Sequence, residues 1–177
     1  KGAMYVEVMV PKNVRHPYPV LFICGGAGET GVTALQTPDG RPGWAYDFLN
    51  AGYTVYVMDF PGRGRSLFFP NSPADGTLIL PRTAPLMEEV WSGGRPPSTP
   101  ESTWPQYQKQ TQWPGDGPNK RKMGDLIYDS FAKTEIATVT GGNVEKYTTD
   151  AIVALVDLIG KPVILLLHSG VAASGWR

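Results

Sequence analysis

The chain has 177 residues, with 16 basic and 16 acidic side chains that cancel. This length is sufficient for one domain with a buried core. The balanced charge gives no electrostatic reason to expect a nucleic-acid partner or an anionic membrane surface. No apolar run approaches the ~18 residues of a membrane span. The sequence shows no signal peptide, but it starts at Lys1, so a leader removed before that residue stays an alternative and the compartment stays open.

The single cysteine, Cys24, lies at the end of the apolar run 20–24. A buried free thiol is expected there rather than a disulfide or a metal ligand. We expect neither a metal nor an organic cofactor.

Four segments outside the middle of the chain have the pattern of regular structure. Residues 4–10 alternate apolar and polar side chains, which predicts a strand, and the continuous apolar run 20–24 predicts a strand covered on both faces. A helix is expected at 44–51 and a strand at 54–58. The last of these strands ends at Asp59.

The segment 66–147 is rich in proline and carries scattered tryptophans, among them Trp91, Trp104 and Trp113. Proline breaks long elements, whereas a disordered linker would carry fewer large aromatic side chains. The segment is therefore predicted to be an irregular excursion that these rings fix over an apolar surface.

Regular structure is expected again near the end of the chain. Residues 148–150 have helix-capping chemistry, an apolar helix face follows to Ile159, and 163–167 predicts a strand. The alternation of strands and helices predicts an α/β fold with a mainly parallel sheet and helices on both faces. We divide the chain into core residues 1–65, a cap or insertion at 66–147, and core residues 148–177.

Ser169 directly follows the predicted strand 163–167 and precedes Gly170. A serine exposed at the tip of a buried strand and followed by small residues is typical of a nucleophile elbow, although an ordinary helix N-cap has the same local pattern. Reacting groups lie at the carboxyl ends of strands in open α/β sheets. Ser169 is therefore the candidate nucleophile.

A glycine-rich loop, GGAGETG at residues 25–31, follows another predicted strand. Acyl transfer needs backbone N–H donors where the carbonyl oxygen becomes negative. One such donor normally follows the nucleophile and the other comes from a loop of this kind. The spacing Gly26-x-Gly28-x-x-Gly31 also fits a dinucleotide fingerprint, but Pro38 interrupts the long helix that this fingerprint requires.

The chain has two histidines, and neither suits the role of catalytic base. His168 adjoins Ser169 in a strand, where neighbouring side chains point to opposite faces, so we expect a packed or supporting histidine. His16 is expected in a surface turn.

Three motifs resemble a known family: GGAGETG at 25–31, TPDGRPGW at 37–44 and DFPGRGRS at 59–66. They are similar to the amino-terminal half of the α/β-hydrolase superfamily, and in particular to a bacterial and fungal esterase-like group with an HGGGQTG loop and a TPDGRPGW turn. The resemblance runs from about Val20 to Trp176. It implies an α/β-hydrolase fold and a carboxylesterase or lactonase.

Carried onto this sequence, the resemblance makes Ser169 the nucleophile and places the oxyanion hole at the N–H groups of Ala27 and Gly170. Gly26 and Gly28 would support that loop. The cap would line an apolar or aromatic substrate pocket with its tryptophans, which are Trp91, Trp104 and Trp113.

The acid and histidine of that group lie in a carboxyl-terminal half that this sequence does not contain. A chain ending here would also leave the strand 163–167 as an apolar edge. We therefore expect this to be the amino-terminal part of the fold, completed by a second polypeptide or a missing carboxyl-terminal segment. Assembly of several copies of this chain into a homo-oligomer is a further alternative that the sequence leaves open.

Two other functions remain open from the sequence. The valine at position 171 departs from the small residues usual after such a serine. A lyase, cyclase or retro-aldol-type enzyme could use the same oxyanion hole for an enolate, and a ligand-binding relative could have lost the triad.

Overall fold

The structure is a computed structural model that describes residues 1–23, 28–91, 113–115, 117 and 120–176. The chain divides into two compact units. The first, called the sheet unit, comprises Lys1–Thr37, Arg41–Pro81 and Ile136–Arg177, and the second comprises Pro38–Gly40 and Arg82–Glu135. Each unit is described by itself.

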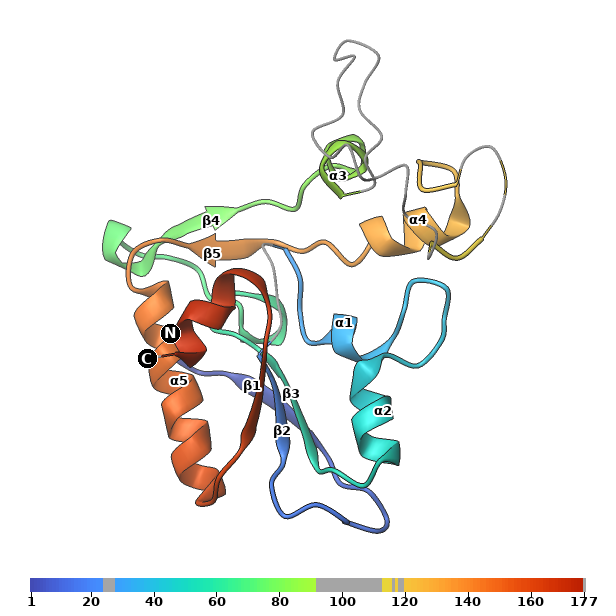
Figure 1. Cartoon of the computed structure of the whole chain (residues 1–177). Coiled ribbons are helices and arrows are strands. Elements are labelled where there is room, and N and C mark those ends of the chain that lie inside the picture. The colour runs from blue at the N-terminus through green and yellow to red at the C-terminus, as the bar shows by residue number, and fades with distance from the viewer. Residues whose placement is uncertain (24–27, 92–112, 116, 118–119, 177) are drawn as a thin grey trace. The chain divides into compact units, whose positions relative to one another are not determined.

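The sheet unit is built on a four-stranded sheet in the order β1-β3-β2-β6 (Figure 1). The strand bounds are β1 Tyr5–Met9, β2 Val20–Ile23, β3 Val55–Asp59 and β6 Ile164–Leu167. The strands β2, β3 and β6 are mutually parallel, and β1 runs antiparallel to β3. The prediction of a mainly parallel sheet is therefore confirmed.

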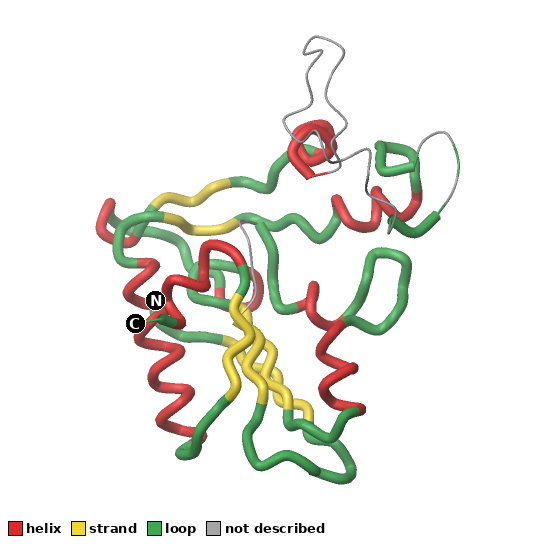
Figure 2. The backbone as a smooth tube through the Cα atoms, viewed as in Figure 1, coloured by secondary structure: helices red, strands yellow, loops and turns green. Residues whose placement is uncertain are grey.

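Helices cover both faces of the sheet, as the sequence predicts (Figure 2). Successive side chains of a strand point to opposite faces, so Val20 and Phe22 pack with α1 and α2, whereas Leu21 and Ile23 pack with α5. All of β2 is buried, which explains its continuous apolar sequence. The helix bounds are α1 Val32–Leu35, α2 Trp44–Asn50 and α5 Val144–Ile159.

The helix α5 begins earlier than its sequence suggests. Capping chemistry at 148–150 predicts a start there, but the helix begins at Val144. Thr148 is a buried residue inside the helix, and its hydroxyl donates to the Val144 carbonyl at 2.9 Å. This back-bond satisfies the hydroxyl without a cap, so the predicted start is wrong, while the apolar face with Ile152 and Leu155 is buried as expected.

A second, two-stranded antiparallel sheet also belongs to the sheet unit. It pairs β4 (Thr77–Ile79) with β5 (Thr138–Thr140), and both strands fall in the segment expected to be irregular. The amide of Val139 in β5 donates to the Gly62 carbonyl at 2.7 Å, which ties this sheet to the loop after β3. Short 3₁₀ helices η1 (Gly64–Ser66) and η2 (Pro73–Asp75) complete the region.

The second unit contains α3 (Ala84–Trp91) and α4 (Leu126–Ala132). Tyr128 is fully buried, and its hydroxyl donates to the Ala84 carbonyl at 2.5 Å, joining the two helices. Arg82 and Glu135 form a two-pronged ion pair at 2.7 and 3.0 Å. The prediction that 66–147 acts as a cap stays a prediction.

Candidate active site

Ser169 lies where β6 ends and the 3₁₀ helix η4 (Ser169–Gly175) begins. Its backbone φ is +59°, in the left-handed region that residues other than glycine seldom occupy. His168 before it is still extended, with φ −141° and ψ 138°. The chain thus turns sharply at one strained residue between strand and helix, which is the geometry of a nucleophile elbow.

The small residues after Ser169 allow η4 to fold back against β6. A Cβ added to Gly175 would lie 2.5 Å from Cδ2 of Leu167, so hydrogen is the only substituent that fits without a shift. Val171, the departure from the esterase-like pattern, packs against the same core as Leu167 and α5. Its branched side chain is therefore accommodated by burial beside the elbow.

The serine is accessible in this chain. Ser169 and Gly170 are both exposed, and no residue within the described ranges hydrogen-bonds to the Ser169 hydroxyl. A Cβ added to Gly170 would meet no atom within 4 Å, so the described chain leaves open space where a side chain would stand. Within the described residues the Ser169 hydroxyl thus has no hydrogen-bond partner.

His168 is exposed, so the expectation of a packed histidine is wrong, whereas a supporting role stays a prediction. Its backbone N–H donates to the Ile23 carbonyl at 3.0 Å. This bond joins the residue after β6 to the last residue of β2, directly before Ser169.

The carboxyl ends of the parallel strands β2, β3 and β6 meet at one edge of the sheet. Of the predicted loop residues, Gly26 and Ala27 lie outside the described residues, as does Cys24. Gly28 is described, with a φ of +85°, and its carbonyl accepts the N–H of Ile136 at 2.9 Å. The described part of the loop is thus hydrogen-bonded at Gly28 to the segment that leads into β5.

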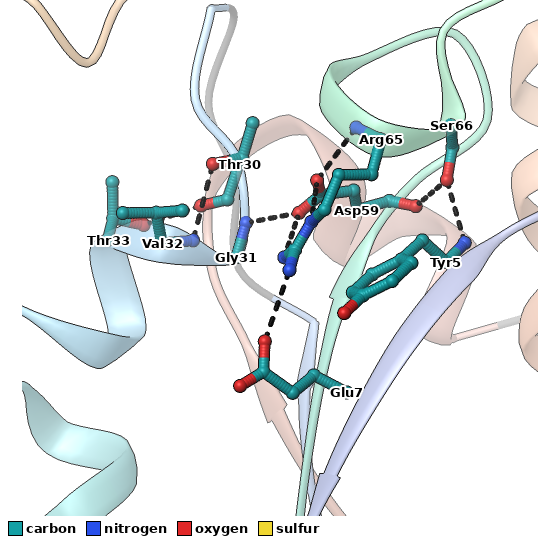
Figure 3. Close-up of polar contacts among 9 residues, drawn as sticks. All are labelled: Tyr5, Glu7, Thr30, Gly31, Val32, Thr33, Asp59, Arg65 and Ser66. Atoms are coloured by element: carbon teal, nitrogen blue, oxygen red, sulfur yellow. Dashed lines mark hydrogen bonds and ion pairs between the residues drawn. The ribbon is translucent and has the colours of Figure 1, made fainter.

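Asp59 ends β3 at this edge with only 1% of its surface exposed. Its carboxylate accepts the Gly31 N–H at 2.9 Å and faces the Arg65 guanidinium (Figure 3). Burial alone would raise the pKa of Asp59, but the hydrogen bonds from Arg65 and Gly31 and the charge of Arg65 hold this pKa below its ordinary value of 3.8. Asp59 is therefore an ionised, buried group.

Sequence reasoning assigned no role to Asp59 beyond its place in the DFPGRGRS motif. A signal was nevertheless present, because an acid ends an otherwise apolar strand and is followed by Gly-Arg-Gly-Arg. A buried carboxylate needs such donors close by.

The predicted pocket tryptophans are placed only in part. The Trp113 indole N–H donates to Asp125 Oδ2 at 3.1 Å, and its ring packs edge-on against Phe131 with centroids 6.4 Å apart. Trp91 ends α3 with its side chain outside the description, and Trp104 lies outside the described residues. Trp113 is thus fixed within the second unit, and the pocket role stays a prediction.

Three further observations concern metal-binding groups, membrane spans and cavities in the described chain. Across those residues no group of three or more His, Cys, Asp and Glu side chains could hold a metal. None of the described helices combines the length and apolarity needed to cross a membrane. A cavity of about 470 Å³ beside β4 contains none of the predicted site residues; it is lined by Phe69, Pro70, Ser72, Pro73, Gly76, Thr77 and Leu78.

The chain is 42% identical over 175 residues to a probable secreted lipase, phiG, of a fungus (Fungal sp., strain ATCC 74256). The match covers 98% of this chain and 44% of the fungal protein. No model of a protein family matches the chain. The chain is therefore related to a probable secreted lipase and spans less than half of its length.

The fold is also found in a solved structure, that of a bacterial esterase. The TM-score is 0.72 at 24% sequence identity, and the match covers 98% of this chain and 52% of the esterase. At this identity the likeness concerns the fold. The chain thus has the fold of about half of that esterase.

Proposed function

We propose that this chain is the nucleophile-bearing part of a serine ester hydrolase, a carboxylesterase or lactonase of α/β-hydrolase type. The observation that carries the proposal is the strained, exposed Ser169 between β6 and η4. The similarity to a probable secreted lipase and the fold shared with a bacterial esterase support it. An ordinary N-cap serine would not need a left-handed backbone, because N-cap residues have extended φ and ψ.

In the proposed reaction, Ser169 Oγ attacks the ester carbonyl carbon while its proton passes to a histidine. The negative oxygen that forms accepts the N–H groups of Ala27 and Gly170. Collapse of this intermediate expels the alcohol, which takes the proton from the histidine, and leaves an acyl group on Ser169. Water then attacks the acyl-enzyme with the same histidine as base, which releases the acid and restores the serine.

The histidine and the acid that orients it are proposed to come from a second polypeptide or a segment outside this sequence. His16 stacks on Tyr53 at 3.7 Å between ring centroids and precedes β2, at the end of the sheet opposite Ser169. Within the described chain, β6 pairs only with β2, and Ile164 and Leu165 are 39% and 37% exposed. A further strand would pair with the backbone groups along the outer edge of β6, and its neighbouring side chains would cover these apolar ones.

The proposed substrate is an apolar or aromatic ester, because the segment 66–147 carries tryptophans expected to line the pocket. A series of p-nitrophenyl esters with growing acyl chains, assayed with every polypeptide of the purified protein present, tests this. We expect hydrolysis that Ser169→Ala removes and that rises with acyl length. The control Ser130→Ala removes an exposed hydroxyl on α4 that donates to the Leu126 carbonyl, its one hydrogen bond among the described residues, and should keep full activity.

Two variants at position 27 test the assignment of the Ala27 N–H to the oxyanion hole. Since the donor is a backbone N–H, Ala27→Gly should keep most of the activity, whereas Ala27→Pro should lose about 10²–10³ of turnover. Equal activity of the two variants would remove Ala27 from the site. Tight binding of apolar esters with no turnover in the complete protein would favour a ligand-binding relative instead.

A further inference from the structure

Arg82 and Glu135 lie where the chain passes between the two units, because the sheet unit stops at Pro81 and resumes at Ile136. The proposed reaction uses neither residue. We propose that their ion pair, called the clasp, closes a hinge: it holds these two connections side by side and restricts the movement of the second unit. That unit makes up most of the segment 66–147 predicted as a cap. The inference goes beyond the proposed function and concerns the conformation of the chain.

The two connections continue the antiparallel ladder of β4 and β5. The ladder ends with Ile79 opposite Thr138, and the two strands lie side by side (Figure 1). In an antiparallel pair, each step forward along one strand is matched by a step back along the other. Three steps further, the same register brings Arg82 opposite Glu135. Side chains at opposite positions are close enough to interact, so the clasp is a cross-strand contact that this register predicts.

The regular backbone pairing stops before the boundary between the units. The strand β4 ends at Ile79, and β5 begins at Thr138. Pro81, directly before Arg82, has no N–H group that could donate to the opposite segment. The side chains of Arg82 and Glu135 therefore supply the link beyond the end of the ladder.

The clasp has the two-pronged geometry of a strong ion pair. Arg82 donates from Nε to Glu135 Oε1 at 2.7 Å and from Nη2 to Oε2 at 3.0 Å. Two parallel hydrogen bonds from a planar guanidinium fix the orientation of the carboxylate as well as its distance. The Glu135 side chain is only 4% exposed, so separating the pair would leave a buried charge without compensation. The clasp therefore resists both separation and twisting of the two connections.

On the side of the sheet unit, one connection is fixed in place. The Val139 N–H donates to the Gly62 carbonyl at 2.7 Å, and the Ile136 N–H donates to the Gly28 carbonyl at 2.9 Å. The neighbouring residue, Glu135, already belongs to the second unit. The connection is thus tied to the sheet unit up to the residue next to the clasp.

On the side of the second unit, the clasp adjoins two helices that are joined to each other. The helix α3 begins at Ala84, shortly after Arg82. The helix α4 ends at Ala132, shortly before Glu135. The buried Tyr128 of α4 donates its hydroxyl to the Ala84 carbonyl at 2.5 Å. Both helices therefore lead directly into the clasp, and movement of one carries the other.

A cysteine pair tests the clasp without leaving a buried charge unpaired. Arg82→Cys/Glu135→Cys is made together with Cys24→Ala, which removes the native thiol. The reduced protein lacks the link, whereas the oxidised protein carries a disulfide in its place. Disulfides need Cα atoms about 4.4–6.8 Å apart, which opposite positions of an antiparallel pair provide. Hydrogen–deuterium exchange followed by mass spectrometry compares the two forms, with every polypeptide of the purified protein present.

We expect the amides of β4, β5 and Ile136 to exchange about 10-fold faster in the reduced form, because a charged hydrogen-bonded pair no longer opposes opening. The oxidised form should match the wild type, and Arg82→Ala should match the reduced form. The matched control is Lys146→Ala, which breaks an exposed ion pair on α5 and should exchange like the wild type.

A distance measurement follows the second unit itself. Spin labels are placed at two exposed positions, Lys133→Cys after α4 and Lys161→Cys after α5, again with Cys24→Ala. Pulsed electron–electron resonance gives the distribution of distances between the labels. Adding Arg82→Ala should broaden this distribution, because the second unit then moves more freely.

Three results would overturn the inference. Equal exchange in the reduced and oxidised forms, or an unchanged distance distribution, would show that the pair does not restrict the hinge. A disulfide that does not form under mild oxidation would show that the two positions do not lie opposite each other. Faster exchange in β2 and β3 as well would assign the pair to overall stability. Should Arg82→Ala not fold, the cysteine pair decides. None of these measurements needs ester hydrolysis, so the proposed function is tested separately.

Discussion

The strain at Ser169 makes a prediction that separates folding from chemistry. A non-glycine residue in the left-handed region costs about 1–2 kcal/mol, because its Cβ crowds the following carbonyl. Glycine avoids this crowding but loses more conformational freedom on folding, which costs about 0.4–1 kcal/mol. Ser169→Gly should therefore be more stable than Ser169→Ala, which keeps a Cβ, by about 0.5–1 kcal/mol.

The comparison of these two variants isolates the backbone, since both lack the hydroxyl. Thermal unfolding followed by circular dichroism should place the melting temperature of Ser169→Gly about 1–4 °C above that of Ser169→Ala. Wild type should melt close to the alanine variant, because the described residues give the hydroxyl no hydrogen bond. If the glycine variant melts below the alanine variant, Ser169 carries no strain and the nucleophile-elbow reasoning fails.

The remaining predictions concern stability and titration. Gly31→Ala should lower the free energy of unfolding, measured with urea, by about 1–3 kcal/mol, because the added methyl group would press on β3. Gly170→Ala, whose methyl group would stand in open space, should change it by less than about 0.5 kcal/mol. Equal losses in the two variants would contradict the packing described for Gly31. Burial, with the nearby acids Glu88 and Asp129, raises the pKa of Tyr128 to about 12, so an absorbance titration should show one late tyrosine that Tyr128→Phe removes. Because the folded-state pKa of Asp59 lies below 3.8, its carboxylate stabilises the fold above that pH, and this stability disappears as the pH falls through the folded-state pKa. Asp59→Asn should flatten this acid dependence, and an unchanged slope would remove Asp59 as its source.

The core of the sheet unit could be predicted from the sequence because its signals are local. The apolar runs of β2 and β6 indicate strands, and the small residues after Ser169 indicate a turn, although only β2 is fully buried in the described chain. The strands β4 and β5 could not be predicted, since each has three residues and its partner lies far along the chain. Pairing of this kind is decided by tertiary contacts rather than by periodicity.

In the candidate site, too, local motifs could be predicted from the sequence, whereas contacts between distant residues could not. Ser169 and Gly170 stand out because a nucleophile elbow is a local motif. The hydrogen bond from Gly31 to Asp59 joins a loop to the end of β3, with α1 and α2 between them in the sequence. No sequence pattern predicts a contact of this kind. Likewise, Thr148 reads as a cap in sequence, and only its position inside α5 explains its buried back-bond.

The central claim is that Ser169 is an activated nucleophile. The most direct measurement is labelling of the purified protein, with all its polypeptides, by a fluorophosphonate, followed by mass mapping of the modified peptide. The account predicts one probe per active site, attached to Ser169 and absent in Ser169→Ala. Labelling at another serine, or none in a protein that hydrolyses esters, would contradict it.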